Sequence, residues 1–357
     1  MAKYSNIKGF TVQTLSTDTI ASQIAGGSWS SGGSLPGARD ECAGGGTLTA
    51  GIQFGGYDPP ASVYRAETFE YNGTAWTEGG NMTNDRSNFG GLGTQTAALA
   101  VGGQSPGVPT GLAKTEEYDG TSWSNGGDAP TGKSDMVSVG TQTAALWGGG
   151  SPTSSASYLY NGTSWTGTGA MTFANRDVYS GGAGTSTAGL SIGGFISPGN
   201  YSAVMQTFDG SSWTNIPQTF PSAPKTNSFA TAGIQTACIS AGPGTDSIEW
   251  DGSSWTTTNN LATANAAAAH QGTVSASVLM TGANPAAPSN YTGTVQTWDG
   301  TNWSNSPASA SNIRSQAVGS GTASAAYVAA GRDSSSPLTA TEEFNGAAVA
   351  TKTLTTS

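Results

Sequence analysis

The sequence predicts an all-β protein, a seven-bladed β-propeller built from four-stranded antiparallel blades. Tryptophan recurs at intervals of 42 to 48 residues, and repeats of about 40 to 50 residues are typical of stacked or radial arrays. All but the first of these tryptophans follow an aromatic residue, Asn or Asp, and Gly, a pattern that favours a tight turn between two strands. The repeated tryptophans are Trp29, Trp76, Trp123, Trp165, Trp213, Trp255 and Trp303.

The second repeat predicts the strands of one blade. Residues 87–93 form a first strand and residues 95–101 a second, which ends in Gly102-Gly103. Residues 114–118 form a third strand, and a fourth begins at residues 122–124. Asp-Gly between the third and fourth strands is a strong hairpin signal, because both central residues of a type I′ turn need positive φ. A turn of either two or four residues places Tyr118 and Trp123 on the same face of the sheet, where the two rings pack together.

Side-chain size favours a radial array over a solenoid. The second strands, such as 96–101 and 143–147, are rich in Ala and Thr. Sheets that stand around an axis crowd near it, so small inner side chains fit the taper. Seven second strands end near glycine, at Gly55, Gly102, Gly148, Gly193, Gly242, Gly282 and Gly331.

The two ends of the repeat region predict how the ring closes. The last copy of the turn, at residues 344–346, lacks its tryptophan, whereas Trp29 precedes any complete blade. We expect residues 27–31 to pair beside residues 339–344, because this pairing removes an open sheet edge. The alternating residues 347–353 are the competing strand. The propeller thus spans residues 26–357, and residues 1–25 form an arm that could serve for attachment.

Composition excludes several classes of protein. The net charge is −10 with only twelve Lys and Arg, which argues against nucleic-acid binding. The sequence contains no apolar run of membrane-spanning length and no secretory signal at residues 1–8, so we expect synthesis in a cytoplasm and no membrane insertion. Cys42 and Cys238 lie in different repeats and form no CxxC motif, which predicts two free thiols.

The repeat resembles the kelch repeat of galactose-oxidase-like propellers over about residues 26–346. The shared marks are the glycines after the second strand, the aromatic residue before the turn, the later tryptophan, and a basic residue ten to twelve positions beyond it. Those basic residues are Arg39, Arg86, Lys133, Arg176, Lys225 and Arg314, with Asn265 in the sixth blade. A narrower likeness, in residues 7–13, 116–123 and 140–146, is to repeat proteins encoded by marine tailed bacteriophages.

Catalytic chemistry is sparse in this sequence. A copper site like that of the galactose-oxidase-like enzymes needs two imidazoles, and the chain has one histidine, His270. The same shortage argues against Ser-His-Asp and Cys-His catalysis. Residues 127–134 match the phosphate-loop pattern, but β-like sequence follows where a helix should start. The sequence therefore predicts a non-enzyme with no catalytic residues, cofactor or metal; calcium at residues 81–85 is a minor alternative.

The phage resemblance implies a virion structural or adhesion protein, associated with a tail or fibre and present in many copies. Its partners would be other virion proteins and a host-surface glycan or protein. Loops of unequal length at residues 57–65, 104–114, 195–203 and 284–292 are the expected contact regions. Their tyrosines could stack on sugars or partner side chains, or merely cap the scaffold. The candidate binding-loop residues are Tyr57, Tyr64, Tyr201 and Tyr291.

Three other functions remain open. A capsid decoration or neck protein would keep the virion location but change the site. A carbohydrate-active enzyme of galactose-oxidase-like fold would follow from the fold alone, which hosts many chemistries. An intracellular kelch-type adaptor would require partner domains, and the propeller occupies nearly all of this chain.

Overall fold

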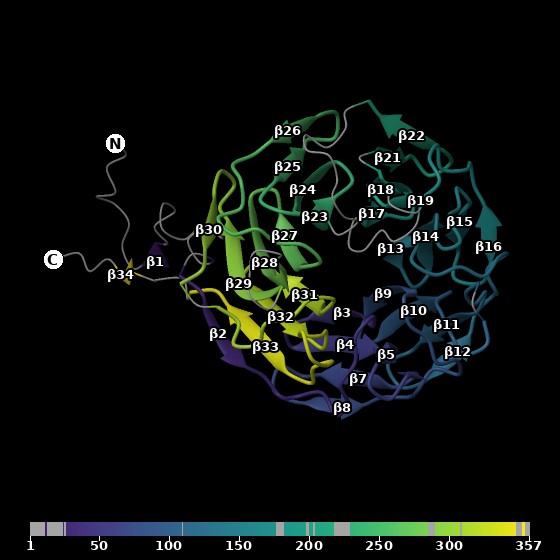
Figure 1. Cartoon of the computed structure of the whole chain (residues 1–357), viewed down its shortest axis with the longest axis horizontal. Coiled ribbons are helices and arrows are strands. Elements are labelled where there is room, and N and C mark those ends of the chain that lie inside the picture. The colour runs from purple at the N-terminus through teal and green to yellow at the C-terminus, as the bar shows by residue number, and fades with distance from the viewer. Residues whose placement is uncertain are drawn as a thin grey trace.

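Seven four-stranded antiparallel sheets stand around a common axis, so the chain is a seven-bladed β-propeller, as predicted (Figure 1). The structure is a computed structural model. It describes residues 11–12, 24, 26–108, 110–175, 182–197, 200–202, 204–217, 229–284, 290–307, 309–347 and 352–353.

Each blade uses its strands in order from the axis to the rim. Blade one contains β3 (Ala43–Thr47), β4 (Ala50–Phe54), β7 (Thr68–Tyr71) and β8 (Trp76–Glu78). Blade two contains β9 (Gly90–Thr94), β10 (Ala97–Val101), β11 (Thr115–Tyr118) and β12 (Trp123–Asn125). Blade three contains β13 (Val137–Thr141), β14 (Ala144–Gly148), β15 (Ser157–Tyr160) and β16 (Trp165–Gly167). Blade four contains β17 (Gly182–Thr185), β18 (Ala188–Ile192), β21 (Met205–Phe208) and β22 (Trp213–Ile216).

The remaining blades repeat this order. Blade five contains β23 (Ala230–Ile234), β24 (Ala237–Ala241), β25 (Ser247–Trp250) and β26 (Trp255–Thr257). Blade six contains β27 (Ala269–Thr273), β28 (Ala276–Ala283), β29 (Tyr291–Trp298) and β30 (Trp303–Asn305). Blade seven contains β31 (Val318–Thr322), β32 (Ala325–Ala329), β33 (Thr341–Asn345) and β2 (Ser28–Ser31). Two small hairpins, β5 (Tyr57–Asp58) with β6 (Val63–Tyr64) and β19 (Phe195–Ser197) with β20 (Asn200–Tyr201), extend blades one and four.

Crowding near the axis falls on the first strands rather than on the second. The first strands of neighbouring blades, such as β3 and β9, contact each other around the centre of the ring (Figure 1). A Cβ on Gly91 would lie 2.1 Å from the Cβ of Ala43, and one on Gly45 would lie 2.3 Å from the oxygen of Gly93. Small residues do relieve crowding near the axis, as the sequence predicts, but they do so on the first strand of each blade and not on the second.

The aromatic turn has the predicted geometry. Tyr118 pairs directly with Trp123 across β11 and β12, which leaves a four-residue loop. Their ring centroids lie 5.1 Å apart. The side chain of Asp119 accepts hydrogen bonds from the amides of Thr121 and Ser122 at 2.8 Å, and this closes the turn without help from other parts of the chain.

The repeated tryptophans also join neighbouring blades. In five of the seven blades the indole Nε1 donates a hydrogen bond of 2.8 or 2.9 Å to a hydroxyl that begins the third strand of the preceding blade. The donor–acceptor pairs are Trp76 with Thr341, Trp123 with Thr68, Trp165 with Thr115, Trp213 with Ser157, and Trp303 with Ser247. Because each of these five tryptophans packs inside its own blade and bonds to the preceding one, it fixes the angle between the two blades.

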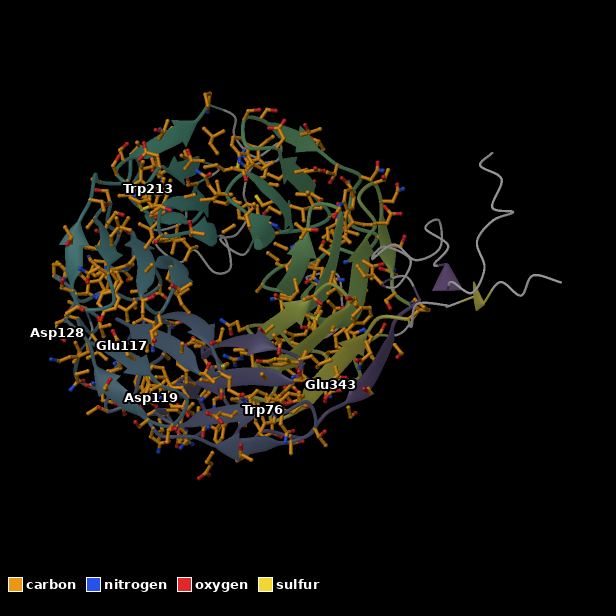
Figure 2. All side chains as sticks on the ribbon, turned by 180° about the vertical axis from the view of Figure 1, so that it is seen from behind. Trp76, Glu117, Asp119, Asp128, Trp213 and Glu343 are labelled. Atoms are coloured by element: carbon orange, nitrogen blue, oxygen red, sulfur yellow. The ribbon has the colours of Figure 1, made fainter. Side chains whose placement is uncertain are left out.

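Tyrosine and glutamate add a second polar contact at three of these junctions. The hydroxyl of Tyr118 donates to Glu70 at 2.6 Å, and Tyr71 and Tyr160 donate to Glu343 and Glu117 in the same way. Figure 2 labels Trp76 and Glu343 where blades one and seven meet, and Trp213 on blade four.

Most of the predicted basic residues that are described act inside the blade. Arg86 is fully buried, donates to the backbone oxygens of Gly102 and Lys114 at 3.0 Å, and pairs with Glu116. Arg314 repeats this with Ala330, Ala340 and Glu342. The side chain of Lys133 instead donates to the backbone oxygen of Pro152, at 2.9 Å.

One assignment in this series is wrong by a residue. In blade four the equivalent of Arg86 is Asn175, whose side-chain nitrogen donates to Gly193 at 3.1 Å and whose backbone oxygen accepts from Gly150. Asn265 fills the same place in blade six through a 2.6 Å bond to Thr281. A shorter amide thus replaces the guanidinium there. Arg176 and Lys225 lie outside the described residues.

The N-terminal strand closes the ring, as predicted. β2 pairs with β33 so that Trp29 lies opposite Phe344, with ring centroids 5.5 Å apart. Within the competing segment 347–353, β34 (Lys352–Thr353) pairs with β1 (Thr11–Val12), and both lie outside the ring (Figure 1). Most of the predicted arm, residues 1–25, lies outside the described residues, so its attachment role stays a prediction.

The junction of blades six and seven lacks the indole hydrogen bond that joins the five pairs above. Val295 lies within β29, three residues before Trp298, at the position that Thr68 holds in β7 and Ser157 in β15. Trp29 Nε1 has no acceptor within the described part of the chain. We expect Val295→Thr to raise the free energy of unfolding by about 1 kcal/mol in urea denaturation, because the new hydroxyl can accept from Trp29.

The control is Val278→Thr in the same blade, at a fully buried position. That hydroxyl would be buried without a designed partner and should cost about 1–3 kcal/mol. Equal destabilisation by the two variants would contradict the proposed role of Val295.

Candidate functional site

One face of the ring carries the long loops. First strands begin and second strands end on this side, so the loops 55–67 and 102–114 and the connections into β3 and β9 lie together there. We call this side the loop face. The opposite turn face carries the short hairpins such as 94–97 and the four-residue turns such as 119–122.

Two of the four predicted tyrosines form a pair. Tyr57 and Tyr64 lie opposite each other in the β5–β6 hairpin, half-buried, with ring centroids 5.0 Å apart. Tyr291 is half-buried at the start of β29, where it pairs with Ala283. Tyr201 belongs to β20 by its backbone, and its side chain lies outside the described residues. Their binding role stays a prediction.

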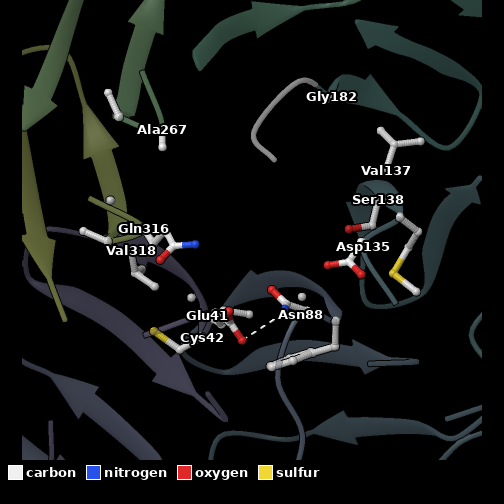
Figure 3. A pocket seen from close by; sticks show the side chains of 18 residues that line it. Glu41, Cys42, Asn88, Asp135, Val137, Ser138, Gly182, Ala267, Gln316 and Val318 are labelled. Carbon is white, nitrogen blue, oxygen red and sulfur yellow. Dashed lines mark hydrogen bonds between the residues drawn. The ribbon is translucent and has the colours of Figure 1, made fainter. Parts of the chain in front are cut away.

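A cavity of about 470 Å³ opens at the end of the central channel on the loop face (Figure 3). It is bordered by the residues that lead into the first strands of several blades. Five of them occupy one repeated position and have positive φ between 50° and 54°. They are Glu41, Asn88, Asp135, Ala267 and Gln316.

Sequence reasoning missed this ring of left-handed residues. Each stands two positions after the basic residue of its blade, or after Asn265 in blade six. Non-glycine residues rarely adopt this conformation, and Asn and Asp are the most tolerant of it. Asn88 and Asp135 at a fixed offset were therefore a readable signal. Strained backbone of this kind often accompanies functional sites.

The polar groups of the ring bond to one another along its edge. The side chain of Asn88 donates to Glu41 Oε2 at 2.8 Å, and Ser87 donates to the same oxygen at 3.1 Å. The backbone of Asp135 donates to Asn88, and its carboxylate accepts from Ser134 at 2.7 Å. Burial raises the pKa of Glu41, and the neighbouring Asp40 raises it further.

Asp40, the neighbour of Glu41 in the chain, is buried in an environment that disfavours its charged form. It is 1% exposed, its nearest cation is Arg332 at 3.4 Å, and neither carboxylate oxygen accepts a hydrogen bond from the described residues. Burial raises its pKa to about 6, although Arg332 opposes the shift. A carboxyl whose pKa is raised by folding destabilises the fold when it is ionised.

Asp40→Asn is expected to raise the free energy of unfolding by roughly 2 kcal/mol at pH 7.5 and by little at pH 4. The penalty of the wild-type carboxylate is complete above its folded pKa of about 6. It disappears as the pH falls toward the ordinary Asp pKa of about 3.9. Chemical denaturation at the two pH values measures this difference. Asp119→Asn is the control, since Asn72 and Asn161 fill the same turn position, and a pH-dependent gain there would contradict the assignment.

His270 is buried, and its two ring nitrogens contact other residues of the propeller. It is 6% exposed, with Nδ1 3.1 Å from the oxygen of Ala230 and Nε2 2.9 Å from Ser277 Oγ. Burial lowers its pKa to about 4. It borders a second cavity, of about 500 Å³, toward the turn-face end of β23, β27 and β31. Both ring nitrogens already have protein partners.

The remaining sequence motifs have ordinary structural roles. The phosphate-loop-like segment leads into the strand β13, so it is a connection between blades. The turn at residues 81–85 is held by Glu116, which accepts from the amides of Thr83 and Asn84. Both cysteines are free, and burial raises the pKa of each thiol to about 12.

No protein-family model and no curated protein matches the chain. Across the described ranges, no cluster of three or more His, Cys, Asp or Glu side chains could hold a metal ion. In the same part of the chain no helix is long and apolar enough to cross a membrane. The geometry of the loop face and its cavity therefore carries the functional argument.

Proposed function

We propose that the protein is a non-enzymatic structural or adhesion component of a tailed-phage virion, carried on a tail or fibre. It presents its loop face to a host-surface glycan or protein, or to neighbouring virion subunits. The observation that carries this proposal is the contrast between the two faces. Loops of unequal length gather on one side of a ring whose blades are locked together by repeated indole bonds.

The phage-like sequence at residues 140–146 contributes to the contacts between blades, and a rigid scaffold suits a component of a particle. Gln142 in the phrase Gly-Thr-Gln-Thr-Ala donates to the backbone oxygens of Ala98 and Tyr118 in the preceding blade. Gln95 does the same to Gly51 and Tyr71. The phrase therefore joins blades and makes the scaffold rigid. The kelch-like marks and the phage resemblance of the sequence supply the rest of the proposal.

A carbohydrate-active enzyme is the less favoured alternative. The single histidine of the chain is buried and has a partner at each ring nitrogen, so it is poorly placed as an acid, a base or a ligand. A capsid decoration or neck protein differs from the proposal only in its position on the virion.

Immunogold electron microscopy of native virions, with an antibody against this chain, tests the location directly. Label at the tail or fibre supports the proposal, label on the head supports the decoration alternative, and unlabelled particles contradict both. Adsorption assays test the role. Particles carrying Tyr57→Ser with Tyr64→Ser should adsorb less, whereas Asp119→Asn on the turn face should leave adsorption unchanged. Full adsorption and integrity of particles that lack the protein would contradict the proposed function.

A further inference from the structure

We propose that the cavity on the loop face binds a sugar with a free amino group, an unacetylated hexosamine, through its ammonium and hydroxyl groups. This deepens the proposed adhesion function by naming the ligand chemistry of the same face. It rests on that function for its biological meaning, while its test uses the purified chain alone.

The lining of the cavity has the size and composition of a small-molecule site. Its volume of about 470 Å³ lies within the roughly 300–1,000 Å³ typical of ligand pockets. Figure 3 shows Glu41, Asn88, Asp135, Ser138 and Gln316 around the space. Among the described lining residues there are two carboxylates, two amides and a hydroxyl, and none is Lys, Arg or His.

The carboxylates select for a positive charge. Asn88 and Ser87 both donate to Glu41 Oε2, which uses two of the roughly four acceptor sites of a carboxylate. The remaining capacity suits a ligand that brings its own donors. Since the described residues hold no metal-binding cluster, an organic ammonium matches this donor set better than a metal ion.

The amides and the apolar wall favour a sugar over a lysine side chain. Asn88, Gln316 and Ser138 offer donors and acceptors for hydroxyl groups, which a lysine side chain lacks. Phe89 and Val318 line the same space and can contact the carbon face of a sugar ring. A monosaccharide uses both kinds of surface.

The left-handed backbone explains why these groups are available. Glu41, Asn88, Asp135 and Gln316 share one conformation at one repeated position, so the ring presents side chains from four blades at the same level. Backbone hydrogen bonds link three of these residues, since Asn88 donates to the oxygen of Glu41 and Asp135 to that of Asn88. Ala267 occupies the fifth such position without a polar group.

Isothermal titration of the purified full chain with glucosamine is the test. We expect saturable binding, at least about tenfold tighter than for N-acetylglucosamine or glucose, because these neutral sugars lack the ammonium. Saturable binding of Nα-acetyl-lysine amide, which keeps its side-chain ammonium, as tight as that of glucosamine would overturn the sugar assignment. Failure to bind any amine would overturn the site.

Variants locate the binding on this cavity. Glu41→Gln should weaken glucosamine binding at least about tenfold, and Asp119→Asn on the turn face should not change it. Thermal unfolding establishes that each variant is folded. If Glu41→Gln does not fold, Gln316→Ala replaces it, because Gln316 is half-buried at the rim of the cavity. Unchanged affinity in a folded cavity variant contradicts the proposal.

The pH dependence gives an independent reading. Glucosamine binds the ionised carboxylate of Glu41, so its affinity should fall as the pH is lowered from 7 to 5. The fall should begin at a higher pH than for an ordinary glutamate, because burial raises the pKa of Glu41. The charged and titratable groups that face Glu41 are Asp40, Arg332 and Tyr64. An affinity that does not change with pH would contradict a role for Glu41. Failure of these binding tests leaves the virion labelling intact, and unlabelled virions leave the binding result intact.

Discussion

Replacing Arg86 with Met is expected to lower the free energy of unfolding by about 3–5 kcal/mol, the usual cost of breaking a buried ion pair. Arg86 and Glu116 are both 0% exposed. Burial alone would raise the pKa of Glu116, but Arg86 and the donors from Asn84 and Thr83 hold it below its ordinary value. Without Arg86 an unpaired charge stays buried. Urea denaturation at pH 7 measures the loss.

Arg65→Met is the matched control for this prediction. Arg65 pairs with Asp58 at 2.5 Å, but both side chains are partly exposed, so the loss should stay below about 1 kcal/mol. Arg86→Met combined with Glu116→Met should recover much of the stability, because no buried charge is then left alone. A single-variant loss no larger than that of the control would contradict the structural role of Arg86.

Trp213→Ala is expected to cost about 3–5 kcal/mol, because it removes a large buried ring and leaves a cavity. Trp213 is 5% exposed, packs 5.2 Å from Phe208 between ring centroids, and donates to Ser157 at 2.9 Å. It therefore supports its own blade and the junction with blade three. Thermal or urea unfolding measures the loss.

Two milder variants separate packing from the hydrogen bond. Ser157→Ala removes only the acceptor and should cost about 1–3 kcal/mol, since the indole N–H is left unpaired. Trp213→Phe keeps an aromatic ring and should fall between that variant and Trp213→Ala. If Ser157→Ala costs nothing, the indole bond does not hold the blades together, and the recurrence of tryptophan is a matter of packing alone.

The architecture was readable from the sequence because its signals are local. The turn from Tyr118 to Trp123 needs only its own six residues to form, including the side chain of Asp119 that closes it. The lost tryptophan after Phe344 and the orphan Trp29 pointed to the closing strand because each one departs from the repeat pattern. What the sequence could not supply is the partner of each side chain in the neighbouring blade, such as Thr68 for Trp123, because that contact depends on the angle between blades.

Two features were misread or missed for physical reasons. Arg176 matched the basic position by residue type, yet Asn175 fills it, because Asn175 stands ten residues after Trp165, as Arg86 stands ten residues after Trp76. The channel-mouth residues were missed because Glu41, Asn88, Asp135 and Gln316 differ in chemistry and share only a backbone conformation. Among the four candidate tyrosines, Tyr57 and Tyr64 pack against each other.

The pairing of β2 with β33 has a consequence for biogenesis. Residues of β2 lack their sheet partner until β33 has been synthesised. The seventh sheet thus forms only through a contact between distant parts of the chain, and such contacts slow folding. We therefore expect the pairing of β2 with β33 to limit the rate of folding. A product truncated before β33 would keep an unpaired, aggregation-prone sheet edge.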